Sequence, residues 1–257
     1  MNRINKLFAS DKQDILSIYF CAGAPMLDAT LEVVKTLEEN GVGMVEIGIP
    51  FSDPMADGLV IQGAATSALR NGMSLRLLFE QLRDVRASVS IPLILMGYLN
   101  PIMQYGFENF CKSCSECGID GVIIPDLPFS DYQKDYRVVA EQYDVKVVML
   151  ITPETSQERI EEIDRNTDGF IYMVSSAATT GAQSDFNAAK IAYFNKINAM
   201  KLHNPRMIGF GISNKATFEA ACQNARGGII GSHFVNLLDE ERDAKRAIER
   251  LKKSLEE

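Results

Sequence analysis

Short apolar runs rich in β-branched residues alternate along the chain with longer segments whose apolar positions recur every three or four residues. Runs of the first kind are typical of buried strands, and segments of the second kind are typical of helices that are apolar on one side. The sequence predicts eight strands, over residues 15–21, 43–49, 92–98, 121–125, 145–151, 170–175, 206–211 and 227–231.

Helix start and stop signals lie between these strands. The segment "LDATLEVVKTLEENG" ends at Asn40-Gly41, which predicts a left-handed C-terminal cap. The segment "SLRLLFEQLRDV" follows a break at Asn71-Gly72 and predicts another helix. The first and last of the predicted helices each have one apolar stripe, made of Leu27, Leu31, Val34 and Leu37 in one and of Ala244, Ala247, Ile248, Leu251 and Leu255 in the other.

The strand runs are mostly apolar throughout, which suits parallel strands covered by helices. Eight strand-then-helix units in 257 residues match the expected size of a (β/α)8 TIM barrel. We therefore expect one TIM-barrel domain over residues 1–257, with no linker or low-complexity tract that divides it. A doubly wound open sheet is the alternative, because the pattern alone does not show that the sheet closes.

The charge and composition of the chain limit the kinds of molecule that we expect it to bind. The formal net charge of −8 argues against a nucleic acid or an anionic membrane as the main partner, but it leaves room for a small phosphate ligand at a helix N-terminus. The first residues lack the apolar region of a signal peptide, and no apolar run approaches the length of about 18 to 20 residues that spans a bilayer. We expect a cytoplasmic protein.

The chain has five cysteines, three of them in "CKSCSEC" at residues 111–117. This spacing resembles the start of a ferredoxin cluster motif, but the fourth cysteine and its following proline are missing. We expect helical thiols and no metal site.

In a TIM barrel the active site lies in the loops at the carboxyl ends of the strands. Glu46 lies inside the second predicted strand, and alternation turns it away from Val45 and Ile47 and toward the barrel interior. Burial raises the pKa of a carboxyl, and general acid catalysis near neutral pH uses such a group. The alternative is a structural glutamate neutralised by a lysine or arginine.

Two aspartates follow in "GIPFSDPMADG". Asp57 precedes Gly58 and a helix predicted from Leu59, so the residues alone leave a catalytic role and a helix-capping role equally open. Asp53 in "SDP" is typical of a turn before proline.

Two glycine-containing segments, "GFGIS" at residues 209–213 and "GGIIGS" at residues 227–232, follow the last two strands. Glycine lets the backbone approach an anion closely, and the helix that follows supplies unpaired N–H groups. Together they predict a phosphate site. His203 and His233 are the only histidines, and they support neither a Ser-His-Asp hydrolase nor a histidine-rich metal site.

At this point the sequence resembles one family, the tryptophan synthase alpha subunit. The resemblance is carried by "VEIGIPFSDPMADG", "IQGAATSALRNG", "MGYLNPI", "GIDGVIIPDLP", "FIYMVS", "GFGIS" and "GSHFV", and it covers nearly the whole chain. In that family a (β/α)8 barrel cleaves indole-3-glycerol phosphate to indole and glyceraldehyde 3-phosphate without a cofactor.

The resemblance implies roles for particular residues. It makes Glu46 in "VEIG" and Asp57 in "ADG" the catalytic pair. It also implies two sets of binding residues, with Tyr98, Tyr172, Thr180 and Gly181 at the substrate and Phe210, Gly211, Gly231 and Ser232 at its phosphate.

The resemblance further implies a partner, a beta chain that holds pyridoxal phosphate, in an α2β2 tetramer. Asp53 and Pro54, with the segment "NPIM", are expected at that interface. The chain departs from the family pattern after the sixth strand, where it reads "SSAATTG" and has Ser176 in place of a frequent arginine. His233 also stands where a small residue is common.

Two alternatives stay open. A different phosphate-binding barrel enzyme would use a metal or a Schiff-base lysine, for which Lys146 is the candidate among the strands, at the start of the fifth. A subunit without catalytic activity, which activates a beta chain, would be consistent with the altered loop.

Overall fold

The computed structural model describes residues 1–175 and 188–256. Its sheet is a closed barrel of eight parallel strands in the order of the sequence, with β1 paired to both β2 and β8. Closure rules out the doubly wound open sheet and confirms the predicted TIM barrel. The described strands are β1 (Ile15–Cys21), β2 (Met44–Gly48), β3 (Leu93–Met96), β4 (Gly121–Ile123), β5 (Lys146–Ile151), β6 (Ile171–Val174), β7 (Arg206–Gly209) and β8 (Gly227–Ile230).

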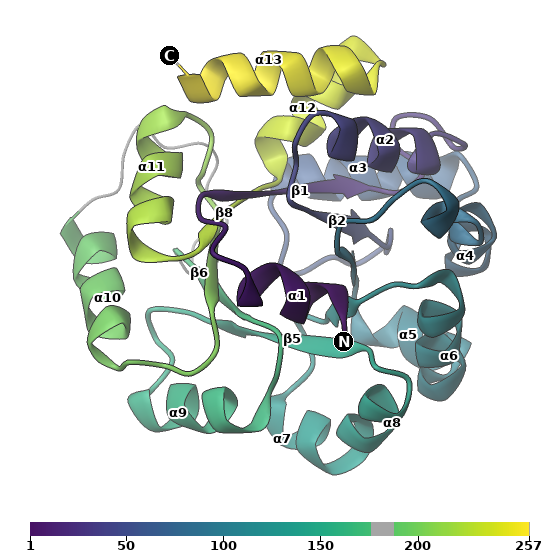
Figure 1. The fold of residues 1–257 in the computed structure, drawn as a ribbon. Coiled ribbons are helices and arrows are strands. Elements are labelled where there is room, and N and C mark those ends of the chain that lie inside the picture. The colour runs from purple at the N-terminus through teal and green to yellow at the C-terminus, as the bar shows by residue number, and fades with distance from the viewer. Residues whose placement is uncertain (176–187, 257) are drawn as a thin grey trace.

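Helices cover the outer side of the barrel, and the first of them along the chain lies across its end (Figure 1). Those before β5 are α1 (Arg3–Ala9), α2 (Thr30–Glu39), α3 (Leu59–Arg70), α4 (Leu75–Leu82), η1 (Val85–Ala87), α5 (Leu99–Tyr105), α6 (Phe107–Cys117), α7 (Phe129–Asp131), η2 (Tyr132–Tyr136) and α8 (Arg137–Gln142). Those after β5 are α9 (Gln157–Asn166), α10 (Ala188–Ala199), α11 (Lys215–Asn224), α12 (Ser232–Glu241) and α13 (Ala244–Glu256).

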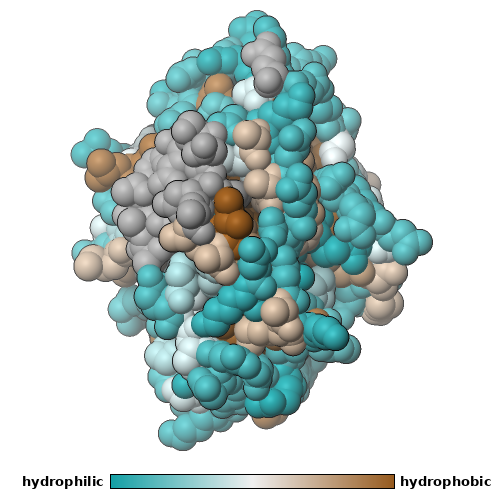
Figure 2. Space-filling model, turned by 90° about the vertical axis from the view of Figure 1, so that its left-hand side faces the viewer, coloured by the Kyte–Doolittle hydropathy of each residue, from teal (hydrophilic) through white to brown (hydrophobic). Residues whose placement is uncertain are grey.

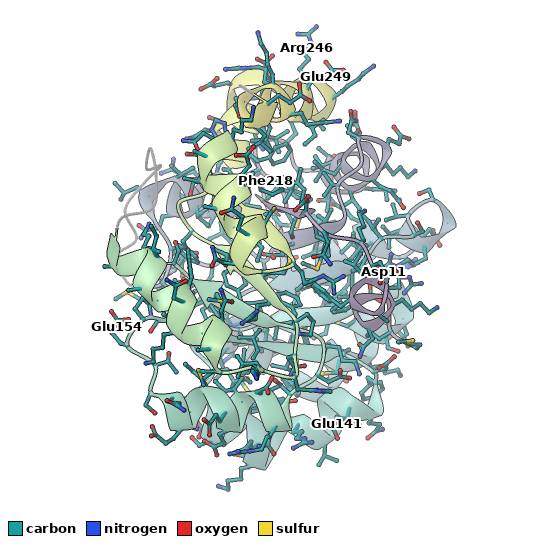
Figure 3. All side chains as sticks on the ribbon, turned by 60° about the vertical axis from the view of Figure 1, so that its left-hand side comes forward. Asp11, Glu141, Glu154, Phe218, Arg246 and Glu249 are labelled. Carbon is teal, nitrogen blue, oxygen red and sulfur yellow. The ribbon has the colours of Figure 1, made fainter. Side chains whose placement is uncertain are left out.

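The predicted helices begin and end close to where the signals lie. Helix α2 starts later than expected, at Thr30, and its C-terminus has the predicted glycine, Gly41, at φ +83°. Helix α4 is capped by Ser74, whose side chain accepts a hydrogen bond from the N–H of Leu77. The last helix, α13, packs on α12 and α2 and turns charged residues such as Arg246 outward (Figure 3).

Two core layers result from the alternation of side chains along the strands. The larger layer lies between strands and helices and contains Val45 and Ile47. The smaller lies inside the barrel and contains Met44 together with Ile4 and Phe8 of α1. Helix α1 therefore closes the barrel at the amino-terminal ends of the strands, and the opposite end is left for the site.

The outer surface is mostly hydrophilic on the side that carries α10 and α11, where brown hydrophobic areas are small and separate (Figure 2). Phe218 lies on α11 on this side of the barrel (Figure 3), where its ring is a close neighbour of Gly228 in β8. Packing of this kind ties the outer helices to the strands that carry the site residues.

Candidate active site

A cavity of about 360 Å³ opens at the carboxyl ends of the strands. This volume is within the range of small-molecule sites. Residues of β1, β2, β3, β6 and β8 line it together with the loops that follow β2, β7 and β8. The cavity therefore lies where the barrel topology predicts an active site.

Glu46 lies on β2 and points into this cavity, as the alternation predicts. Its carboxyl is fully buried. The hydroxyl of Ser17 donates to Oε1 at 3.3 Å, and Oε2 has no hydrogen-bond partner among the described residues. Burial raises the pKa of Glu46 to about 8, and the Ser17 hydrogen bond opposes this only in part. Glu46 is therefore mostly protonated at neutral pH and still able to ionise.

Two buried tyrosines share the cavity with Glu46. Tyr19 pairs with Glu46 across the β1–β2 ladder, and Tyr172 comes from β6. Burial raises the pKa of both hydroxyls well above the ordinary value, and the nearby carboxylates raise it further. Both hydroxyls therefore stay protonated and can donate hydrogen bonds. Glycine is required beside each ring, because a methyl group on Gly48 or Gly209 would overlap the tyrosine hydroxyl.

Asp57 lies at the edge of the cavity, at the end of the loop that follows β2. The hydroxyl of Tyr98 donates to Asp57 Oδ2 at 2.9 Å and accepts from the N–H of Ala56, also at 2.9 Å. Burial raises the pKa of Asp57, and the Tyr98 hydrogen bond lowers it. The N-cap of α3 is Gly58, and the carboxylate of Asp57 contacts Tyr98 instead of capping the helix. The capping interpretation is therefore wrong.

Tyr98 itself does not border the cavity in the described part of the chain. It lies beside a small adjoining hollow with Pro54, and its ring packs on Phe51 at a centroid distance of 5.4 Å. Asp53 is exposed, and its carboxylate accepts a hydrogen bond from the side chain of Ser52. Its backbone oxygen also accepts from the N–H of Met55, so Asp53 takes part in a turn at Pro54 through its backbone.

The loop after β7 forms one side of the predicted phosphate site. Phe210 and Gly211 have φ values of +68° and +77°, both in the left-handed region. For a residue with a side chain this conformation costs about 1–2 kcal/mol, and such strain is often found at functional sites. The hydroxyl of Ser175 donates to the Phe210 carbonyl at 2.6 Å, and the Phe210 ring packs edge-on against Tyr172.

The N-terminus of α12 forms the other side. Gly231 precedes the helix and Ser232 begins it, and both line the cavity. The N–H groups of a first helical turn have no partner within the helix, and the helix dipole adds partial positive charge there. The two predicted glycine segments thus meet at one end of the cavity, and Glu46 lies on β2 in the same cavity.

His233 is the second residue of α12 and also lines the cavity. Its Nε2 lies 3.2 Å from the hydroxyl of Ser254 in α13, and that hydroxyl donates to the carbonyl of Leu251. Because the hydroxyl proton is used there, His233 is the donor to Ser254. Burial and the charge of Arg250 lower the pKa of His233, so the ring is neutral near pH 7.

The structure brings together most of the predicted site residues but not all of them. Thr180, Gly181 and the altered positions from Ser176 onward lie outside the described residues. Sequence reasoning missed Tyr19, although the polar residues Ser17 and Tyr19 alternate along β1 and so share the face that meets Glu46.

The cysteines and the lysine that suggested other kinds of chemistry lie outside the described lining of the cavity. Cys111, Cys114 and Cys117 are buried free thiols on α6, as predicted. Lys146 forms ion pairs with Asp144 and Asp168 at the start of β5, away from the described cavity lining. In the described residues no group of three or more His, Cys, Asp or Glu side chains is arranged to bind a metal, and no helix is long and apolar enough to cross a membrane.

Comparison with known proteins gives one family throughout. The family model for the tryptophan synthase alpha chain matches residues 6–257. The tryptophan synthase alpha chain of Bacteroides thetaiotaomicron is 72% identical over 255 residues, which cover 99% of this chain and 100% of that protein. That of Flavobacterium psychrophilum is 55% identical over 240 residues, or 93% of this chain and 94% of that protein.

Comparison with solved structures indicates the same family. The crystal structure of the tryptophan synthase alpha chain from Legionella pneumophila has a TM-score of 0.86 at 32% identity, covering 99% of this chain and 96% of that one. A chain in the crystal structure of a tryptophan synthase complex from Pyrococcus furiosus has a TM-score of 0.85 at 34% identity, covering 96% and 98%. The chain belongs to the tryptophan synthase alpha chain family, as its motifs predicted.

Proposed function

We propose that the chain is a lyase of L-tryptophan synthesis that cleaves indole-3-glycerol phosphate to indole and glyceraldehyde 3-phosphate by a retro-aldol reaction. The observation that carries the proposal is Glu46, a fully buried carboxyl with a pKa of about 8 that faces a cavity of substrate size. The loop at Gly211 and the helix start at Ser232 would anchor the phosphate and leave the indole ring near Glu46 and Asp57.

The reaction needs one group that acts first as an acid and then as a base. Neutral Glu46 donates its proton to C3 of the indole ring, which becomes an indoleninium cation. The Glu46 carboxylate then takes the proton of the hydroxyl on the carbon attached to C3. The bond between that carbon and C3 breaks, its electron pair returns to the ring, and the carbon becomes an aldehyde. Glu46 ends protonated, so the cycle needs no net proton.

Asp57 has the complementary role in this proposal. An ionised carboxylate close to the ring N–H stabilises the positive charge of the indoleninium intermediate. The hydrogen bond from Tyr98 favours the ionised form of Asp57 and fixes the orientation of its carboxylate. Tyr172, held neutral by burial, is a hydrogen-bond donor available to the substrate. Thr180 and Gly181 complete the proposed substrate contacts.

We also propose a beta chain as partner, with pyridoxal phosphate bound there and no cofactor in this chain, in an α2β2 tetramer. Exposed hydrophobic side chains near Asp53 and Pro54 support an interface, because Met55 is 88% exposed and Met103 in the nearby "NPIM" segment is 48% exposed. All five cysteines lie in the described residues as free thiols, which suits the proposed cytoplasmic location.

The experiment is steady-state cleavage of indole-3-glycerol phosphate by the full chain, alone and with a beta chain. Glu46→Gln is expected to fold and to lose activity by about 10²- to 10⁴-fold, because it cannot exchange a proton. Glu249→Gln, on the outward side of α13, is the matched control and keeps wild-type rates. A wild-type chain that activates the beta chain but cleaves nothing would mean that the subunit is not catalytic. A folded, active Glu46→Gln protein would contradict the assignment of Glu46.

A further inference from the structure

Lys190 is a buried lysine beside the predicted phosphate site. It is the third residue of α10, and only 6% of its surface is exposed. A methyl group placed on Gly211 would lie 3.5 Å from Lys190 Nζ and 3.9 Å from the hydroxyl of Ser175. The ammonium therefore lies against the backbone of the loop that follows β7, next to the left-handed residues Phe210 and Gly211.

Two described features oppose a positive charge on Lys190. Burial lowers the pKa of Lys190, because the charged form is poorly solvated. The first turn of a helix also disfavours a cation, since the N-terminal end of the helix dipole is positive. An anion held beside Gly211 would favour the charged form of this ammonium.

The described lining of the cavity offers no lysine or arginine to a phosphate. It includes the carboxyl group of Asp57 and the carboxyl group of Glu46, which is mostly neutral at pH 7. A phosphate monoester brings about −1.5 to −2 charges at pH 7. Backbone N–H groups at Gly211 and at the start of α12 bind its oxygens but neutralise only part of that charge. A cation just behind Gly211 would supply the rest.

We propose that the Lys190 ammonium is the cation that binds the substrate's phosphate group, from the Gly211 side of the cavity. The inference rests on the proposed function, because it takes the phosphate of indole-3-glycerol phosphate as the ligand. The sequence motifs predict a phosphate site made of glycines, Phe210 and Ser232. The proposal adds to this site a charged side chain from α10.

The test compares two substrates that differ only in the phosphate. Lys190→Met keeps the length of the side chain and removes its charge, and Lys196→Met on the exposed side of the same helix is the matched control. For indole-3-glycerol phosphate, KM is expected to rise about ten- to hundredfold in Lys190→Met with a smaller change in kcat, which is the usual value of a hydrogen bond to a charged group. For indole-3-glycerol, which lacks the phosphate, kcat/KM is expected to stay at the wild-type value.

A purely structural role for Lys190 gives a different result, because kcat/KM would then fall equally for both substrates. That outcome overturns the proposal, as does an unchanged KM in Lys190→Met. Lys190→Arg should recover much of the affinity, since it restores the charge. If Lys190→Met does not fold, Lys190→Gln gives the same comparison.

Calorimetric titration with sn-glycerol 3-phosphate separates this proposal from the proposed function. If the wild-type chain cleaves neither substrate but binds glycerol 3-phosphate at least tenfold more tightly than Lys190→Met does, the phosphate role of Lys190 stands and the lyase activity fails. If wild type and variant bind it equally, or if neither binds it, the role of Lys190 is refuted even where cleavage is observed.

Discussion

Glu46→Gln is expected to stabilise the fold at alkaline pH while it removes activity. The pKa of this carboxyl rises from 4.5 to about 8 in the folded protein, because burial penalises the charged form. Between these two values the folded state holds one proton more than the unfolded state does. The free energy of unfolding of the wild type therefore falls as the pH rises from 4.5 to 8.

The size of the effect follows from the two pKa values. Their difference corresponds to about 5 kcal/mol of unfolding free energy, lost at about 1.4 kcal/mol per pH unit. Glutamine carries no charge at any pH, so the variant lacks this loss. Its amide does place an N–H₂ group near the position of Oε2, which leaves a buried donor unpaired at a pH-independent cost of about 1–3 kcal/mol. The variant should thus be less stable than wild type at pH 4.5 and more stable by about 2–4 kcal/mol above pH 8.

Urea unfolding of both proteins at each pH from 4.5 to 9 measures this directly. The difference between the two free energies is the quantity to plot, because other titrating groups are shared and cancel. A difference that stays constant over the whole range would refute the reasoning, since it would mean that Glu46 is not held as a neutral acid. The same pKa predicts that wild-type kcat/KM falls above pH 8.

Two further changes test the rest of the site. Tyr98→Phe removes the hydrogen bond to Asp57, so the pKa of Asp57 should rise. The acidic limb of the pH profile of kcat/KM should then move to higher pH. A lower kcat with an unmoved acidic limb would contradict the role of Tyr98. Gly209→Ala places a methyl group on the hydroxyl of Tyr172 and should lower kcat/KM at least tenfold. Gly63→Ala is the control, because Gly63 has open space around it and its variant should keep the wild-type kcat/KM. Equal activity of the two variants would show that the position of Tyr172 is unimportant.

Much of the fold follows from local pattern. The eight apolar runs each contain a strand, and the strands are shorter than the runs by up to three residues because the ladder ends before the apolar residues do. Gly41 caps α2 as predicted, since a left-handed position after a helix favours glycine. Closure of the sheet depends on the pairing of Ile15 with Gly227, more than 200 residues apart, which no local pattern specifies.

The candidate site likewise contains some residues that the local sequence predicts and others that it does not. Glu46 was predictable because a charged residue inside an apolar strand has one face to occupy. The contact of Asp57 with Tyr98 joins loops 41 residues apart and depends on how each loop folds, so sequence alone favoured a helix cap as strongly. Lys190 carries no signal in the sequence, because a lysine in the first turn of a helix is expected to face solvent.

Helix α1 closes the amino-terminal end of the barrel, and the described cavity opens at the other end. Ile4 is fully buried and packs with Phe8 among the side chains of the barrel interior. Molecules that reach or leave Glu46 therefore pass through the opening at the carboxyl ends of the strands. In the proposed reaction, a substrate bound there would separate the carboxyl from bulk water for the length of one turnover. Hydrogen isotope exchange between Glu46 and solvent should then be limited by the departure of product, and its rate would report on release without any measurement of the chemical step.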